Sequence, residues 1–206
     1  FTEFGSGFKI AMRDLEIRGA GNLLGAEQHG HMEAIGYDMY SKLLKEAVTN
    51  LQKEDSQESF ETTVDLDITA YIPESYIRSE EQKLEMYKKI ATIQSQEDFY
   101  DVQEELEDRY GDLPNSTVYL LDIALLKAMA HDLGIISITQ KKDNIIITFK
   151  QNAKVNPVKI PKLIQHHHNR LLFTAAIEPY FTYRLLRKQQ KEIIRQIKNI
   201  LQELKD

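Results

Sequence analysis

The chain has 206 residues, no cysteine and a formal net charge of −6, with 42% hydrophobic and 28% charged residues. This length allows one large or two small domains with a core sufficient for unaided folding, and the composition is ordinary for a globular protein. The absence of cysteine excludes disulfides and thiolate metal sites. No apolar run approaches the ~18 residues of a membrane span and no signal pattern opens the chain, so we expect a cytoplasmic protein without membrane contact.

The first segment, residues 7–53, predicts two helices joined by a glycine-rich loop. Apolar residues between Phe8 and Ile17 have the spacing of a buried helical stripe. A second helix is expected from about residue 36 to 53 on the same criterion. Glycines between the helices predict a backbone that turns sharply or approaches another surface closely. These hinge glycines are Gly19, Gly21, Gly25 and Gly30.

A polar stretch and an alternating segment follow. Residues 52–59 predict a linker between the hairpin and the next domain. Residues 64–72 alternate strictly between apolar and polar side chains and predict a strand that ends at Pro73. Asp65 and Asp67 would share its solvent face, but two carboxylates are too few ligands for a divalent ion.

Three helices are then expected, at about 79–94, 97–110 and 115–133. Ser95 or Gln96 can begin the second helix, and Gly111 follows its end, where positive φ is favoured. Pro114 suits the first turn of the third helix, which is apolar on most sides and is therefore expected to be central. Gly134 should stop it. The predicted buried stripe of the second helix is Phe99, Val102, Leu106 and Tyr110.

The last third of the chain predicts strands and two further helices. Residues 135–139 and 145–149 flank the turn-prone segment 141–144 and predict a hairpin. A helix around 157–168 and strands near 171–175 and 180–184 come next. The closing helix is expected over 185–204, packed on its own sheet rather than self-associating. Its apolar seam would consist of Leu186, Ile193, Ile197, Ile200 and Leu204.

These elements predict an α+β protein of two parts. Residues 1–55 would form the N-terminal helical hairpin. Residues 60–206 would form a mixed α/β domain with a small sheet flanked by several helices.

Histidines are candidates for metal ligation. His166, His167 and His168 are consecutive, and adjacent helical side chains point about 100° apart, so all three cannot reach one ion. A solvated helix end is therefore the expected environment, and a metal site would need ligands from elsewhere. The same objection applies to His29 and His31 in the glycine loop.

Motifs for nucleotide chemistry are absent from this sequence. It contains no phosphate-binding Gly-x-x-x-x-Gly-Lys-Ser/Thr loop, no acidic magnesium box, no Gly-x-Ser-x-Gly elbow and no dinucleotide fingerprint. We therefore expect no catalytic residue, no metal and no cofactor in this fragment, and no ATP hydrolysis by it alone.

Residues 7–40 resemble the translocation motif shared by transcription-repair coupling factors and RecG-type helicases. The matching positions are the run from Asp14 to Gly21, then residues 23–25, then Gln28 with Gly30. The continuation through residues 31–37 to Tyr40 favours the coupling factor. Three later segments favour it as well: 64–73, 87–90 and 107–114.

The resemblance implies a role in coupling ATP hydrolysis to movement. In that family the hairpin lies beside the motor of a double-stranded-DNA translocase, which uses ATP and Mg²⁺. Arg18 and Gln28 occupy the positions of the coupling pair, with Asp14 and Glu16 in the same motif. A guanidinium fork and a glutamine amide are suited to sensing a neighbouring lobe. Without the resemblance, Arg18 would simply pair with Asp14 or Glu16, and Gln28 would be an ordinary loop residue.

The resemblance also implies a regulatory C-terminal domain. In this family the parent protein displaces stalled RNA polymerase and recruits the damage-recognition protein UvrA. Residues 60–206 would dock against the N-terminal module of the same parent and mask its recruitment surface. The fragment would then be the C-terminal part of a longer motor.

Charge is distributed unevenly along the chain. Residues 51–135 contain 7 basic and 20 acidic residues, whereas residues 136–206 contain 14 basic and 5 acidic ones. Such asymmetry suits a docking surface, solvated faces or a nucleic-acid face. The alternative function is therefore a stand-alone nucleic-acid-binding module, although no stacking box or recognition helix accompanies the basic residues. Its candidates are Lys150, Lys154, Lys159, Lys162, Arg170, Arg184, Arg187, Lys188, Lys191 and Arg195.

Overall fold

A computed structural model describes residues 60–151, 153, 156–186 and 189–205. Within these ranges, five strands form one mixed sheet in the order β1-β2-β3-β5-β4. The first pair, β1 and β2, is parallel, and the other neighbours are antiparallel. The strands are β1 (Thr63–Asp65), β2 (Ile135–Lys141), β3 (Asn144–Phe149), β4 (Leu171–Thr174) and β5 (Tyr180–Arg184).

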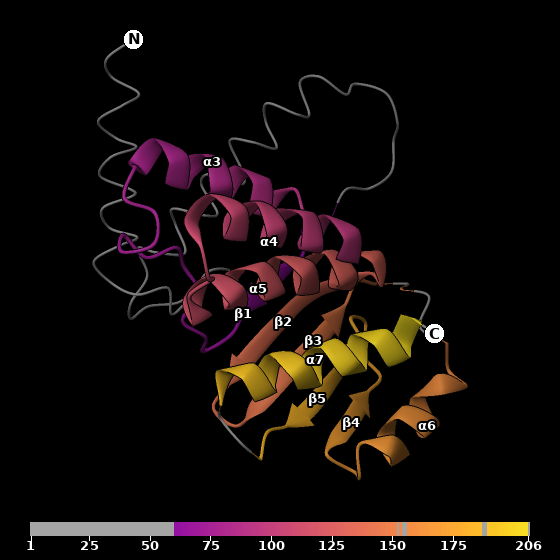
Figure 1. Cartoon of the computed structure of the whole chain (residues 1–206). Helices are drawn as coiled ribbons and strands as arrows, with labels where there is room; N and C mark the ends of the chain where they lie inside the picture. Colours follow the sequence, from indigo (N-terminus) through magenta and orange to yellow (C-terminus); the bar gives the residue numbers. More distant parts are fainter. Residues whose placement is uncertain (1–59, 152, 154–155, 187–188, 206) are drawn as a thin grey trace, which may run out of the picture.

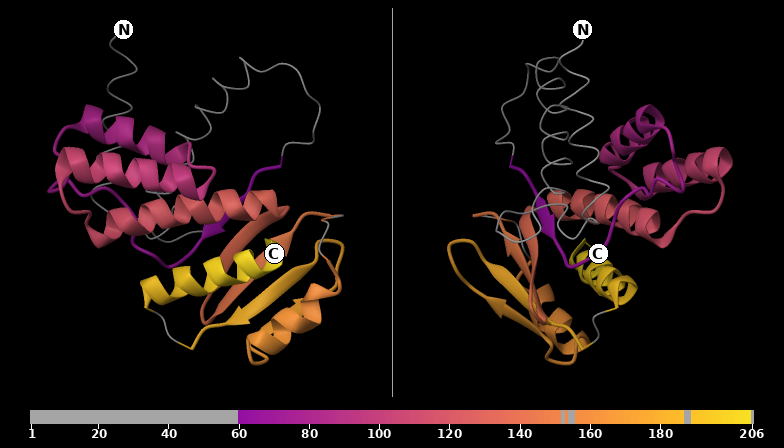
Figure 2. Two further views of the ribbon diagram at one scale, coloured as in Figure 1. Left: turned by 45° about the vertical axis from the view of Figure 1, so that its right-hand side comes forward. Right: turned by 90° about the vertical axis from the view of Figure 1, so that its left-hand side faces the viewer.

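Three helices form the crossover between the two parallel strands, because parallel neighbours cannot be joined by a tight turn. These are α3 (Glu80–Ala91), α4 (Gln96–Tyr110) and α5 (Asn115–Asp132). Figures 1 and 2 show α5 lying along the sheet, with α3 and α4 stacked on its outer side. Two more helices, α6 (Lys159–His166) and α7 (Gln190–Lys205), complete the described part, and α7 runs beside α5 over the same face of the sheet.

The core lies between the sheet and the helices α5 and α7. Phe149, Phe181 and Tyr183 project from β3 and β5, and each is at most 1% exposed. Helix α5 contributes apolar side chains from most of its circumference, as the sequence predicted for a central helix. The predicted α+β class, with a small sheet flanked by several helices, is confirmed for the described residues.

Capping residues in the sequence predicted most helix boundaries to within a few residues of their position in the structure. Ser95 caps α4 through a reciprocal capping box with Asp98, and Gly111 follows the helix at φ +84°. Pro114 is the residue immediately before α5 rather than part of its first turn. Gly134 ends the α5 segment at φ +72°.

The prediction of a strand over residues 64–72 is wrong beyond Asp65, where strand β1 ends. Its apolar residues are nonetheless all buried, with Val64, Leu66, Ile68, Ala70 and Ile72 at most 3% exposed. The backbone beyond β1 makes its hydrogen bonds elsewhere: the amide of Tyr71 donates to the Ser116 carbonyl, and that of Ile72 to the Tyr87 hydroxyl. Alternation predicted the burial correctly, whereas the ladder ends because the chain turns from the sheet towards the helices.

The closing helix predicted over 185–204 begins later, at Gln190. The amide of Leu185 donates to the Asp143 carbonyl at 2.8 Å, which extends the β5 backbone past Arg184. Leu186 is 72% exposed, so it belongs to no buried seam. The buried side chains of α7 are Ile193, Ile194, Ile197, Ile200 and Leu201.

Among the described residues, no helix has both the length and the apolar character needed to span a membrane.

Candidate docking surface

The site residues predicted from the translocation motif lie outside the described residues, so their geometry stays a prediction. They are Asp14, Glu16, Arg18 and Gln28, with the hinge glycines Gly19, Gly21, Gly25 and Gly30. His29 and His31 lie outside them as well.

The outer side of α4 is a strongly acidic surface in the described part of the chain. Glu97, Asp101, Glu104 and Asp108 recur at four- and three-residue intervals, which places their side chains on one face of the helix. All four are exposed. We call these four residues the acidic α4 face. Tyr100 lies beside them and is 59% exposed, which adds an aromatic side chain of the kind common at interfaces.

Helix α4 is held firmly from its inner side. Phe99 and Leu106 are 7% and 0% exposed, and they pack into the core. The Tyr76 hydroxyl donates to the carbonyls of Leu106 and Gly111 at 3.0 and 2.8 Å, which fixes the end of the helix. Burial, and then nearby Glu107, raises the pKa of Tyr76 to about 12, so this donor keeps its proton at neutral pH. The acidic α4 face is thus presented on a rigid support.

A second group of carboxylates on these helices is already paired. Arg109 donates to Glu85 of α3 at 3.0 Å and to Glu105 of α4 at 2.9 Å, and Lys89 also pairs with Glu105. A hydrogen bond from Arg109 lowers the pKa of Glu85, and one from Lys89 lowers that of Glu105. This network links α3 to α4 and balances two carboxylates with two cations. No basic side chain of the described ranges pairs with the acidic α4 face, whose charge is therefore available to a partner.

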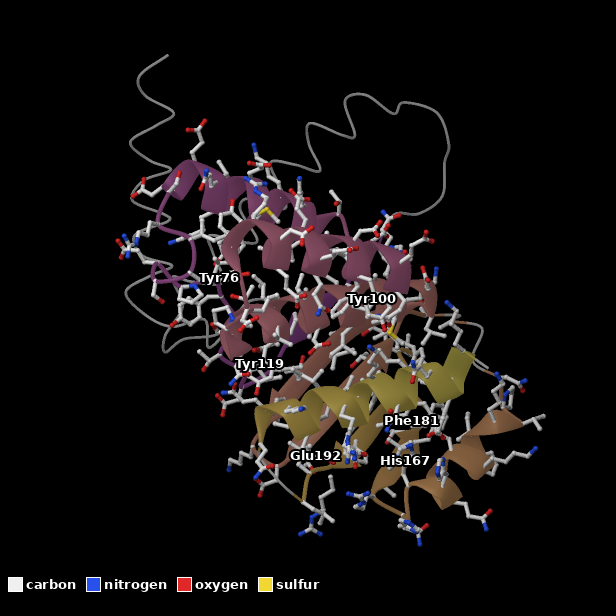
Figure 3. All side chains as sticks on the ribbon, in the orientation of Figure 1. Tyr76, Tyr100, Tyr119, His167, Phe181 and Glu192 are labelled. Carbon is white, nitrogen blue, oxygen red and sulfur yellow. The ribbon has the colours of Figure 1, made fainter. Side chains whose placement is uncertain are left out.

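Two of the predicted basic residues contact other side chains of the same chain. Arg195 is engaged by Glu192 at 2.8 Å, and the Arg170 guanidinium lies 5.3 Å from the centre of the Tyr183 ring. These residues line a pocket of about 250 Å³ at the end of the sheet. It lies beside the start of α7, where Glu192 is labelled in Figure 3. Lys154, Arg187 and Lys188 lie outside the described residues.

The residues that line this pocket are paired with one another: Tyr183 donates to Gln196, and Gln196 donates to Glu192. An arrangement of satisfied polar groups suits structure rather than chemistry.

Sequence reasoning identified the acidic middle of the chain but missed the helix face on which the charge is concentrated. The signal was available, because the four carboxylates follow helical spacing within the predicted helix 97–110. Reasoning also missed that His167 is buried at 6% exposure, while His166 and His168 are exposed as expected. The difference in burial between His167 and its neighbours depends on how α7 packs, and the sequence around the histidines does not reveal that packing.

The crossover helices and the β2–β3 hairpin correspond to a known domain class. Residues 66–160 match the TRCF domain family. The fold is also that of a solved structure described as the C-terminal domain of transcription-repair coupling factor. The two align with a TM-score of 0.66 and 24% identity over 72% of this chain and 94% of that one.

Full-length relatives extend this match along the chain. The transcription-repair-coupling factor of Bacillus subtilis is 46% identical over 154 residues, and that of Borreliella burgdorferi is 36% identical over 193 residues. These alignments cover 74% and 93% of this chain but only 13% and 17% of the relatives. The chain belongs to the transcription-repair-coupling factor family and spans a small part of the length of its members.

Proposed function

We propose that this chain is the C-terminal part of an ATP-dependent double-stranded-DNA translocase that displaces stalled RNA polymerase and couples transcription to nucleotide excision repair. The observation that carries this proposal is the TRCF domain match over residues 66–160, together with relatives named transcription-repair-coupling factors. ATP and Mg²⁺ would bind in parts of the parent that this chain does not include. The chain itself would contribute coupling and regulation rather than an ATP hydrolase site.

Residues 1–55 would couple ATP hydrolysis to translocation. The Borreliella burgdorferi relative supports this assignment, since an alignment covering 93% of the chain must include much of this segment. Arg18 would contact the neighbouring motor lobe as a fixed fork of donors, and Gln28 would both donate and accept. Asp14 and Glu16 would orient that arginine, and the glycines would let the loop follow the motor stroke.

Replacing Arg18 or Gln28 with alanine in the full-length parent should uncouple the motor. We expect DNA-dependent ATP hydrolysis to continue while translocation falls at least tenfold, measured by displacement of a triplex-forming strand. Glu46→Ala, in the same segment but outside the matched motif, is the control and should translocate normally. Equal translocation per ATP in the Arg18, Gln28 and control variants would contradict the coupling role.

Residues 60–206 would act as the docking domain. The acidic α4 face is rigid, exposed and unpaired with described cations, and it suits a basic surface on the N-terminal module of the parent. Docking there would mask the surface that recruits UvrA. Such a restraint works if its docked and released states differ by a few kcal/mol, so that a partner can shift the equilibrium.

Charge reversal of the acidic α4 face tests this role. In the full-length parent, Glu97→Lys, Asp101→Lys, Glu104→Lys and Asp108→Lys combined should release the domain and increase UvrA recovery in a pull-down several-fold. A matched variant carries the same charge change at dispersed exposed positions, Glu74, Glu81, Asp132 and Glu178. UvrA recovery that stays at the wild-type level in the α4 variant, or rises equally in the dispersed variant, would contradict docking through α4.

A nucleic-acid-binding module remains the second candidate, on the excess of basic residues after residue 136. Filter binding of duplex DNA to this chain at two salt concentrations separates the two functions. Docking through α4 predicts no binding at micromolar protein. Micromolar affinity with a steep salt dependence would favour the nucleic-acid module instead.

A further inference from the structure

Two histidines at the end of α6 and one glutamate of α7 converge at one point. The Nδ1 atom of His166 lies 2.8 Å from Oε2 of Glu203, and the Nε2 atom of His167 lies 3.4 Å from Oε1 of the same carboxylate. The candidate ligand atoms of the three residues all lie within 4.8 Å of one another. His167 is labelled in Figure 3, below α7 and beside α6.

The His167 ring provides a second, independent observation. Its side chain is 7% exposed, and its Nε2 atom is buried with no hydrogen-bond partner among the described residues. A buried polar atom without a partner is uncommon in native proteins and calls for a physical explanation. The nearest ligand atom of Glu203, Oε1, lies 3.4 Å away without forming a hydrogen bond to it. A metal ion between them would satisfy both groups.

The backbone explains how adjacent histidines can face the same carboxylate. His166 is the last residue of α6 and His167 caps it, so the two side chains leave from a helix that is ending. The chain then reverses through His168 and Asn169, both with positive φ, and the amide of Arg170 donates to the His167 carbonyl. One histidine therefore presents its near nitrogen and the other its far nitrogen.

Packing holds the buried ligand in place before any ion binds. The His167 ring meets the Tyr183 ring edge to face, with centroids 5.7 Å apart. Leu163 and Leu201, on α6 and α7, are 3% and 0% exposed and belong to the core on which both helices rest. The relative position of the two helices is therefore set by the core, as a preorganised site requires.

We propose that His166, His167 and Glu203 form a binding site for a divalent transition-metal ion of the Zn²⁺ class. Zn²⁺ binds imidazole nitrogen and carboxylate oxygen at about 2.0–2.2 Å, and tetrahedral geometry then separates two ligand atoms by roughly 3.3–3.5 Å. The 3.4 Å separation between Nε2 of His167 and Oε1 of Glu203 already matches this value. The 2.8 Å contact of His166 is to the other carboxylate oxygen, Oε2, so the Glu203 side chain has to rotate for one oxygen to face both histidines. His166 is 70% exposed, so water can take the fourth position.

The surroundings favour a transition metal over a hard cation. Two of the three candidate ligand atoms are imidazole nitrogens, and the side chain that carries one of them, His167, is only 7% exposed. Two imidazoles with one carboxylate suit Zn²⁺, Co²⁺ or Ni²⁺, whereas Ca²⁺ and Mg²⁺ need more oxygen ligands.

A bound ion would join the end of α6 to the last turns of α7. The described contacts between these helices include the hydrogen bond from Lys159 to the Leu204 carbonyl, at 3.4 Å. Metal ligation would add a stronger cross-link at the opposite end of α6. The site would therefore stabilise this edge of the domain and supply no catalysis.

Titration of Zn²⁺ into the metal-free 206-residue chain tests the proposal. We expect one equivalent to bind at micromolar or tighter affinity by calorimetry, and saturating Zn²⁺ to raise Tm by about 5 °C. Co²⁺ should give the visible absorption of a four-coordinate ion with nitrogen and oxygen ligands. His166→Gln and Glu203→Gln should each weaken binding at least tenfold.

Controls separate this site from other histidines and from loss of folding. His168→Gln replaces the exposed neighbour outside the cluster and should bind like the wild type. A His29→Gln, His31→Gln double variant removes the glycine-loop histidines and should also bind normally. Each variant is accepted only if its circular dichroism and its Tm in EDTA equal those of the wild type. Absence of binding at about 100 µM Zn²⁺, or binding that survives both His166→Gln and Glu203→Gln, would overturn the proposal.

Discussion

At the scale of single residues, Asp122 is a carboxylate placed where its charge is unfavourable. It lies on α5, and the nearest cations that act on it, Lys198 and Lys191, belong to α7. Burial raises the pKa of Asp122, and the attraction of the two lysines only partly opposes this effect. The folded state therefore holds the proton more tightly than the unfolded chain does. Stability consequently falls as pH rises through the window above the ordinary value of 3.8.

Asp122→Asn should accordingly stabilise the protein at neutral pH. The amide removes the desolvation of the charge, so we expect Tm at pH 7 to rise above that of the wild type. The difference should shrink as pH falls and vanish below about pH 3.8, where the wild-type carboxyl is protonated in both states. Thermal unfolding of both proteins between pH 3 and pH 8 measures this difference in Tm. Asp101→Asn, at an exposed position, is the control, and a lower Tm for Asp122→Asn at pH 7 would refute the explanation.

Residue-scale features were predictable from the sequence where they depend on near neighbours. The cap at Ser95 and the positive φ at Gly111 follow from a few adjacent residues. The environment of His167 does not, because its burial and its approach to Glu203 require a helix 36 residues further along the chain. The predicted roles of Arg18 and Gln28 depend on a partner lobe, and no geometry in the described residues bears on them.

At the scale of whole elements, α7 shows where periodicity misleads. Leu186 fits the heptad spacing of the closing helix, but it lies before the helix and is 72% exposed. The hydrogen bond between Leu185 and Asp143 fixes the preceding backbone along β5, so the helix begins only at Gln190. The start of α7 is therefore set by pairing with a distant strand, which a heptad pattern does not reveal.

Two substitutions on this segment should therefore differ sharply. Ile197→Ala removes a fully buried side chain between α7 and the sheet and should cost about 2–5 kcal/mol of unfolding free energy in urea. Leu186→Ser should change it by less than about 0.5 kcal/mol. Size-exclusion chromatography should give the same oligomeric state for the wild type and Leu186→Ser. If the wild type were a dimer and Leu186→Ser a monomer, the predicted apolar seam that includes Leu186 would be an association surface after all.

The segment that begins with strand β1 shows what an alternating pattern can and cannot predict. Alternation over residues 64–72 predicted every buried side chain correctly, since burial depends on which way each residue points. It could not predict where pairing stops. The amides of Tyr71 and Ile72 find partners on α5 and α3, which a single strand pattern does not reveal.

At the scale of the whole molecule, the layers explain why α4 is available for docking. Helices α5 and α7 cover the sheet, and α3 and α4 form a further layer outside α5, as Figure 2 shows. Helix α4 buries its inner side against this support and turns four carboxylates outwards. The family and the fold class could be recognised from sequence motifs. The spacing of the four carboxylates could be read from the sequence, whereas the rigid support that holds the acidic α4 face follows from contacts between α4 and residues distant in the chain, such as Tyr76.

The affinity between this chain and the N-terminal module of its parent tests the docking role most directly. We expect calorimetric titration to show binding that weakens at least tenfold when Glu97, Asp101, Glu104 and Asp108 are changed together to lysine. Raising salt from ~50 to ~500 mM should weaken the wild-type interaction as well, because the proposed contact pairs four carboxylates with a basic surface. The dispersed charge-reversal variant should bind within twofold of the wild type. Equal affinity of the wild type and the α4 variant, at either salt concentration, would contradict docking through this helix.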